Sequence, residues 1–335
     1  MVSMVRISAV IIIRSHSISS KELDYLIILT HILEYLIQAL VELINIDMKT
    51  YQIHNAWGTI VEFDNPMDFF SVDQKVWRDM IYDRKLIVFK RMNFKLIDYM
   101  KFAYAFGDPW SAEDYRYSRE KPVLVNENDK TYVTSEFSNK IVSTSRIGFI
   151  EMPWHADIPN RQVKPFPHRS LWIVKNPNPE NSGKTKWLNI NLRDCKQYLT
   201  DELVDLIPRV TLTQQSWYSE GTDIQTHSFV KTHPVTGETS LRLNYYNDLS
   251  KGITNAWIKE VFIDGVKQAD CSLIQKFIDC LLQEPSMVYY HQWDDYDIAL
   301  YDNYPFIHGR TPLKLNTQEG IAERKFYRTN IDHVV

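Results

Sequence analysis

The sequence predicts a mainly β fold of the sandwich or barrel class, with helices flanking the strands. Short runs rich in β-branched and aromatic residues alternate with turn formers such as Gly107-Asp108-Pro109, which is typical of all-β architectures. No internal repeat, low-complexity tract or charge block divides the body of the chain into two domains. The predicted strands are LIVFK (86–90), SLWIVKN (170–176), TKWLNI (185–190), SLRLNYY (240–246) and IALYD (298–302).

Four segments show the apolar periodicity of helices. Two of them precede the main set of strands, and the third begins with a Thr-Asp pair that favours a helix N-terminus. The fourth, DCSLIQKFIDCLL, is strongly amphipathic. The predicted helices cover residues 74–83, 94–105, 199–207 and 270–282.

Composition excludes several classes of protein. The chain has 335 residues, with 38 Lys+Arg against 42 Asp+Glu and a formal net charge of −4. We expect no nucleic-acid partner, because such binding needs a clustered basic face. Cys195, Cys271 and Cys280 cannot build a disulfide framework, and none forms a Cys-x-x-Cys zinc pair. These features, with no export signal, predict a cytoplasmic protein.

The N-terminal residues 1–47 form an apolar or amphipathic extension of uncertain status. Residues 23–44 would just span a bilayer in length, but Asp24, Glu34 and Glu42 interrupt them, so we expect no stable membrane insertion. Three readings stay open: a helix packed on the domain or on a partner, an extension outside any domain, and an interfacial anchor. The predicted domain covers residues 48–335, since Met48 would be a sensible start.

A metal site is the sharpest chemical signal. His155 lies two residues before Asp157, and residues i and i+2 of an extended strand project from the same face. His308, near the end of the chain, is the second candidate nitrogen ligand. Two imidazoles and one carboxylate on one face of a metal form the arrangement of non-haem Fe(II) oxygenases, which leaves coordination positions open.

Further motifs in matching order resemble the TauD/TfdA family of Fe(II)- and 2-oxoglutarate-dependent dioxygenases. WHAD, containing both His155 and Asp157, resembles the family's W-H-x-D. The resemblance covers roughly residues 51–330, and the ordered set is far more specific than any single motif. The other matching segments are SGKTKW (182–187), KTHPVTGETSLRLN (231–244), YDNYPFIHGR (301–310) and ERKFYR (323–328).

The resemblance implies a double-stranded β-helix, a jelly roll similar to that of clavaminate synthase. It implies that His155, Asp157 and His308 are the catalytic iron ligands. Thr185 and Arg324 would bind the distal carboxylate of the cosubstrate 2-oxoglutarate, where a guanidinium fork suits a carboxylate. Arg328 would serve the anionic end of cosubstrate or substrate, unless it forms a structural salt bridge. O2 is the oxidant.

The resemblance also implies hydroxylation of an unactivated C–H bond of a small molecule, with release of succinate and CO2. Desaturation, cyclisation or isonitrile formation in natural-product biosynthesis stays open, as does an inactive jelly roll used for binding. Tyr304 replaces a family arginine, which argues against taurine itself as the substrate. Relatives often form dimers or tetramers, so a homo-oligomer is compatible with the resemblance. Of the other histidines, His233 is expected to be structural and His168 to lie in a loop.

Overall fold

The computed structural model describes residues 47–115, 122–127, 130–138, 151–156, 168–176, 179–215, 224–242, 258–312 and 324–333. Three sequence expectations fall outside these ranges: the apolar segment 23–44, the predicted ligand Asp157, and the last residues of the predicted strand 240–246. Among the residues that are described, no helix is long and apolar enough to cross a membrane.

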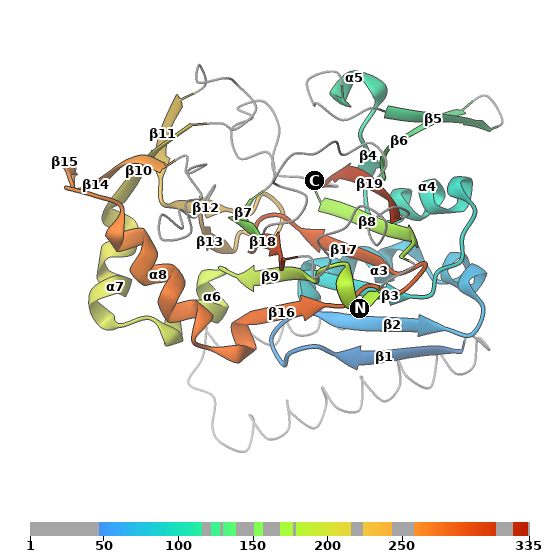
Figure 1. The fold of residues 1–335 in the computed structure, drawn as a ribbon, viewed down its shortest axis with the longest axis horizontal. Coiled ribbons are helices and arrows are strands. Elements are labelled where there is room, and N and C mark those ends of the chain that lie inside the picture. The colour runs from blue at the N-terminus through green and yellow to red at the C-terminus, as the bar shows by residue number, and fades with distance from the viewer. Residues whose placement is uncertain are drawn as a thin grey trace, which may run out of the picture.

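A large sheet runs through the centre of the molecule (Figure 1). Its order is β1-β2-β3-β17-β8-β19-β6-β5, and β4 pairs with β19. β2 and β3 are parallel and the other pairs are antiparallel. The strands are β1 (Met48–Gln52), β2 (Thr59–Phe63), β3 (Leu86–Lys90), β4 (Asp108–Pro109), β5 (Pro122–Glu127), β6 (Lys130–Ser138), β8 (His168–Lys175), β17 (Ile298–Asp302) and β19 (Lys325–Asp332).

A smaller sheet of order β16-β9-β18-β7 packs against one face of the large sheet. Its strands are β7 (Met152–His155), β9 (Thr185–Asn189), β16 (Val288–His291) and β18 (Phe306–Arg310). Trp187 of β9 and Phe306 of β18 share a buried cluster with Val88 of β3 and Ala299 of β17. Two facing sheets that share one core confirm the predicted jelly roll, the double-stranded β-helix with flanking helices.

The opposite face of the large sheet is covered by helices. Ile87, Phe89 and Leu300 point to this face and pack with Trp77 and Phe102 of the helices α3 and α4. Side chains therefore alternate along β3 and β17 between an inner face, toward the small sheet, and an outer face, toward the helices. The helices here are η1 (Pro66–Ser71), α3 (Gln74–Arg84), α4 (Leu96–Tyr104) and α5 (Ala112–Tyr115).

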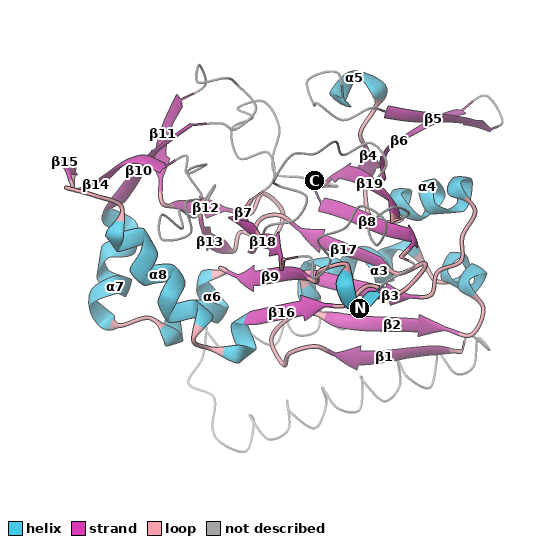
Figure 2. Ribbon diagram, in the orientation of Figure 1, coloured by secondary structure: helices cyan, strands magenta, loops and turns pink. Residues whose placement is uncertain are grey.

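A third sheet of order β11-β10-β14-β15 and the helices α7 and α8 form one end of the molecule (Figure 2). α8 buries Ile274, Phe277, Ile278 and Leu281 in the core of this end, so the predicted amphipathic helix is present. The remaining elements are η3 (Pro179–Asn181), α6 (Leu192–Cys195), η4 (Lys196–Tyr198), α7 (Asp201–Leu206), η5 (Ile207–Arg209), β10 (Val210–Gln215), β11 (Ile224–Ser228), β12 (Val230–Thr232), β13 (Thr239–Leu241), β14 (Ile258–Ile263), β15 (Val266–Lys267), α8 (Ser272–Leu282) and η8 (Pro285–Met287).

The predicted elements agree closely with the observed ones. The strands 86–90 and 298–302 have the predicted bounds, and all four helices form within a few residues of the predicted ends. Thr200 accepts a hydrogen bond from the backbone N–H of Leu203 and so caps α7, as its side chain favours. The strand predicted at 240–246 corresponds to β13, which begins one residue earlier, at Thr239, and ends at Leu241. His168 is the first residue of β8, so its expected place in a loop was wrong.

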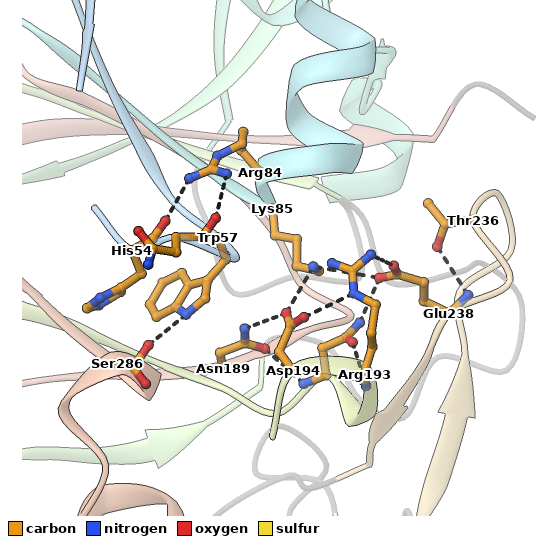
Figure 3. A network of polar contacts seen from close by, with 12 residues as sticks. His54, Trp57, Arg84, Lys85, Asn189, Arg193, Asp194, Thr236, Glu238 and Ser286 are labelled. Atoms are coloured by element: carbon orange, nitrogen blue, oxygen red, sulfur yellow. Dashed lines mark hydrogen bonds and ion pairs between the residues drawn. The ribbon is translucent and has the colours of Figure 1, made fainter. Parts of the chain in front are cut away.

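A buried polar network joins the sheets to the β12–β13 turn (Figure 3). The Lys85 ammonium donates a hydrogen bond to the Asp194 carboxylate at 3.0 Å, and it lies 3.7 Å from the Glu238 carboxylate. The Asn189 amide donates to the same Asp194 oxygen at 2.9 Å. Burial by itself raises the pKa of the Asp194 carboxyl, but Lys85, Asn189 and Arg193 outweigh it, and the net pKa is lowered. The network therefore keeps this buried carboxylate charged.

Candidate active site

Two of the three predicted iron ligands lie directly opposite each other. His155 ends β7, and its Cα partner across the antiparallel pair is His308 in the middle of β18. Both side chains are buried, and their ring centroids are 4.4 Å apart. Partners across a strand pair point to the same face of the sheet, so the pairing joins residues that are 308 − 155 = 153 positions apart in the chain.

This pair fits a bound iron ion in chemistry and placement. Imidazole nitrogens are common ligands of Fe(II), and a third ligand of carboxylate type completes the oxygenase arrangement. Asp157, the predicted carboxylate, lies outside the described residues. The Tyr301 hydroxyl lies 3.4 Å from Nε2 of His308. Tyr301 was not among the predicted site residues, although the alternation of IALYD assigns it to the same face as Ala299.

The predicted cosubstrate residue Thr185 lies on the strand next to His308. Thr185 begins β9, and its Cα partner in β18 is Arg310. The indole N–H of Trp293 donates a hydrogen bond to the Thr185 hydroxyl oxygen at 2.7 Å. Because that oxygen is used as an acceptor, the hydroxyl proton remains available for donation to a ligand. Trp293 was missed by the sequence reasoning, because no local pattern distinguishes it from an ordinary core residue.

Arg324 is placed to bind an anion. One of its terminal nitrogens, Nη1, donates to the carbonyl oxygen of Ser182 at 2.9 Å. Its Nε is buried and has no hydrogen-bond partner among the described residues. Burial and the nearby Arg310 guanidinium lower the pKa of Arg324 to about 10, so it stays charged at neutral pH. An orphaned guanidinium donor beside a second guanidinium fits a dicarboxylate such as 2-oxoglutarate.

Arg328 lies on β19, four residues after Arg324. Its Cα partners are Ser135 on β6 and Leu171 on β8. Leu171 packs against the core between the two sheets, so Arg328 shares the inner face with it. The register therefore places Arg328 on the inner face of the large sheet, toward the small sheet that carries His155 and His308.

His291, the Cα partner of Thr185, belongs to a buried polar cluster beside the predicted cosubstrate residue. It lies on β16, and its Nε2 is 3.1 Å from the Asp297 carboxylate. The Lys90 ammonium pairs with the same carboxylate at 2.5 Å. Burial lowers the pKa of His291 although Asp297 acts in the opposite direction. β16 is an edge strand of the small sheet, and these contacts give His291 a role in stabilising that edge.

Several known proteins resemble this chain in sequence or in fold. The model of the "Taurine catabolism dioxygenase TauD, TfdA family" matches residues 49–329. A taurine dioxygenase from Burkholderia xenovorans superimposes with a TM-score of 0.58 at 18% identity, covering 87% of this chain and 92% of that one. PvcB from Pseudomonas aeruginosa gives 0.60 at 15% identity, covering 85% and 91%.

Two of the relatives come from isonitrile chemistry. Another structure of PvcB describes it as an Fe, α-ketoglutarate-dependent oxygenase from an isonitrile synthetic pathway; its TM-score is 0.56 at 14% identity, covering 85% of this chain and 91% of that one. α-Ketoglutarate is another name for 2-oxoglutarate. The 3-((Z)-2-isocyanoethenyl)-1H-indole synthase of Fischerella ambigua (strain UTEX 1903) is 29% identical over 97 residues, which is 28% of this chain. That match spans 33% of the length of the synthase.

Proposed function

Because the chain belongs to the TauD/TfdA family, and is thus a dioxygenase dependent on Fe(II), 2-oxoglutarate and O2, we propose that it oxidises a C–H bond of a small molecule at His155, Asp157 and His308. The observation that carries the proposal is the direct pairing of His155 and His308 across β7 and β18. Succinate and CO2 are the products of the cosubstrate, and hydroxylation is the primary outcome.

Each residue has a defined task in this proposal. His155 and His308, with Asp157, would hold the metal and leave coordination positions for the cosubstrate and O2. Arg324 binds the distal carboxylate of 2-oxoglutarate through its free Nε, and Thr185 donates its hydroxyl proton to the same carboxylate. Bound iron with 2-oxoglutarate and O2 supplies the oxidising power for removal of hydrogen from carbon.

The chain's own packing protects this chemistry from water. Trp187, Tyr301 and Trp293 are almost fully buried in the core between the two sheets. A buried, largely apolar lining excludes water from the reacting groups and strengthens the charge interactions of Arg324 within the site. Arg328 lies on the inner face of the large sheet, where it would bind an anionic group of the substrate or cosubstrate.

A second candidate outcome is desaturation of a substrate in isonitrile biosynthesis. It is favoured by the Fischerella synthase and by PvcB, whose names or descriptions include isonitrile chemistry. The electrons balance without another reductant: decarboxylation of 2-oxoglutarate gives two electrons, removal of two hydrogens from the substrate gives two, and one O2 accepts all four, leaving one oxygen atom in succinate and one in water. Hydroxylation uses the same oxidant but leaves the second oxygen atom on carbon.

The test begins with anaerobic binding. Fe(II) and 2-oxoglutarate are added to the protein, and the visible charge-transfer band of the complex is recorded. Candidate substrates, among them taurine and isonitriles made from aromatic amino acids, are then screened for coupled succinate release. Product mass separates the outcomes, because hydroxylation adds one oxygen atom and desaturation removes two hydrogens. Failure of the protein to form the band would overturn the assignment of the site.

A further inference from the structure

A second group of potential metal ligands lies away from the predicted iron site. His168 begins β8, Asp302 ends β17, and these two residues are Cα partners. His333 follows the end of β19, two residues after Ile331, which is the Cα partner of His168 on the other side. One ligand atom from each of His168, Asp302 and His333 lies within 4.8 Å of the others.

The group faces the helix-covered outer side of the large sheet. Asp302 lies two residues after Leu300 on β17 and so shares its face, and Leu300 packs against the helices. The ring centroid of Tyr82 in α3 lies 5.9 Å from that of His333, in a stacked arrangement. It lies 5.3 Å from that of His168, in a tilted arrangement. Tyr301, next to Asp302, points instead to the inner side, where it approaches His308. The two groups of histidines therefore lie on opposite sides of the large sheet, because His155 and His308 belong to the small sheet that packs on its inner face.

The buried imidazole of His168 is the feature that indicates a bound ligand. Its side chain is fully buried, and neither ring nitrogen has a hydrogen-bond partner among the described residues. A buried nitrogen that loses water without a new partner costs free energy, of the order of 1–3 kcal/mol. Burial and the neighbouring His333 lower the pKa of His168 well below its usual range. A neutral imidazole with an unpaired ring nitrogen is the form of histidine that binds metals.

The Asp302 carboxylate is oriented by its surroundings. One of its oxygens, Oδ1, accepts a hydrogen bond from the backbone N–H of Tyr304 at 2.8 Å, and the other, Oδ2, lies 2.9 Å from Nε2 of His233. The backbone N–H groups of Val235 and Thr236 both donate to Nδ1 of His233 at 3.0 Å. Because Nδ1 is an acceptor, the His233 proton is on Nε2 and faces the carboxylate.

We propose that His168, His333 and Asp302 bind a divalent cation of the zinc class, with His233 as a positioning residue for Asp302. Two imidazoles and one carboxylate are common zinc ligands, and a water molecule would complete four-coordination. Ligand atoms at about 2.0–2.1 Å from zinc stand roughly 3.3 Å apart in a tetrahedron. Small rotations of the side chains would close the present spacing to this value. The carboxylate–imidazole contact of Asp302 with His233 is the kind of outer contact that tunes metal sites.

The polar network of Figure 3 holds the positioning residue in place. The backbone N–H of His233 donates to the carbonyl oxygen of Glu238, closing the turn between β12 and β13. The Glu238 carboxylate lies close to the Lys85 ammonium, and the carbonyl of Lys85 accepts from the backbone N–H of Asp302 at 2.9 Å. The same buried network thus fixes both His233 and Asp302, which is what a rigid metal site needs.

Zinc stoichiometry in the full-length protein tests the proposal. The protein is stripped of metal with a chelator, titrated with Zn²⁺ and freed of excess metal, and bound zinc is measured by mass spectrometry. We expect about two equivalents for the wild type, one for each site. The His168→Gln/His333→Gln variant should keep one equivalent, at His155 and His308. The His155→Gln/His308→Gln variant should also keep one, at the proposed cluster.

Two further measurements test the proposal even if one of these variants fails to fold. X-ray absorption at the zinc edge of the His155→Gln/His308→Gln protein should show two imidazole ligands, and fewer would overturn the proposal. The substitution His233→Gln should weaken zinc at the cluster about 10–100-fold, as loss of an outer carboxylate partner does, while His227→Gln on β11 should leave it unchanged. The proposal also fails if the wild type binds a single equivalent that is lost with His155 and His308.

Discussion

His308 on β18 and His155 on β7 are direct partners across an antiparallel strand pair, and their imidazole centroids lie 4.4 Å apart. Neither residue is near the other in sequence, and neither strand alone would define a site. On the other side of β18, the Cα partner of His308 is Trp187 of β9, and Thr185 lies two residues before Trp187 on the same face. The two predicted iron ligands and the predicted cosubstrate residue Thr185 therefore lie on three neighbouring strands of one small sheet.

Replacement of either histidine should abolish turnover. We expect His155→Ala and His308→Ala to reduce coupled succinate formation by more than the roughly 10–100-fold that loss of an outer metal contact costs. Iron content after anaerobic loading should fall in parallel, while circular dichroism stays like the wild type. His227→Ala, on β11 of the separate sheet, is the matched control and should keep full activity. Wild-type succinate formation by either ligand variant would contradict the assignment.

Arg324→Ala should weaken cosubstrate binding far more than metal binding. Loss of a hydrogen bond to a charged group costs about 1.5–3 kcal/mol, which is roughly a 10- to 150-fold rise in the Kd of 2-oxoglutarate. The charge-transfer band, titrated anaerobically at fixed Fe(II), measures this Kd. Arg209→Ala removes an exposed pair with Asp264 and serves as the control. Equal weakening of iron and 2-oxoglutarate would point to a structural role for Arg324.

Asp194→Asn should destabilise the fold strongly at neutral pH. Removal of one partner of a buried ion pair costs about 3–5 kcal/mol, and here it leaves the Lys85 ammonium with the more distant Glu238. Urea unfolding of the wild type and the variant at pH 7 gives the difference in free energy of unfolding. The exposed pair of Arg209 and Asp264 is the control, because Asp264→Asn should leave the free energy of unfolding nearly unchanged.

The advantage of Asp194 should disappear in acid. The pKa of this carboxyl is lower in the folded protein than its ordinary value, because Lys85, Asn189 and Arg193 outweigh the opposing effect of burial. Its contribution is therefore fully present above the unfolded pKa of about 3.9 and is lost as the pH falls through the folded pKa. Stability curves of wild type and Asp194→Asn should approach each other below about pH 4. A constant difference down to pH 2 would show that charge is not the cause.

Cys195 should resist alkylation in the native protein. It is fully buried, and burial together with Asp194 raises the pKa of its thiol to about 12, so at pH 8 only about one molecule in ten thousand carries the reactive thiolate. Iodoacetamide should label the partly buried Cys271 first and Cys195 only after unfolding in urea. Peptide mass spectrometry measures both rates in one digest, and rapid native labelling of Cys195 would contradict its burial.

Local sequence determined the elements and the chemistry of the predicted site. The strands 86–90 and 298–302, the cap at Thr200 and the amphipathic helix at 270–282 follow from periods and caps that are read over a few residues. The residue types of the predicted iron site, two histidines and a carboxylate close in sequence to the first of them, also follow from the ordered set of motifs. Such signals depend on neighbours in the chain, so the sequence carries them directly.

The tertiary structure alone decided which distant residues meet. His168 was expected in a loop, but it begins β8 and becomes the partner of Asp302, 134 positions later (302 − 168). The hydrogen bond of Trp293 to Thr185 is a contact of the same kind, and Arg310 lies near enough to Arg324 to lower its pKa. The register between strands far apart in sequence is set by the packing of two sheets over a shared core. No local pattern encodes that register, so the second cluster of histidines became visible only in the folded chain.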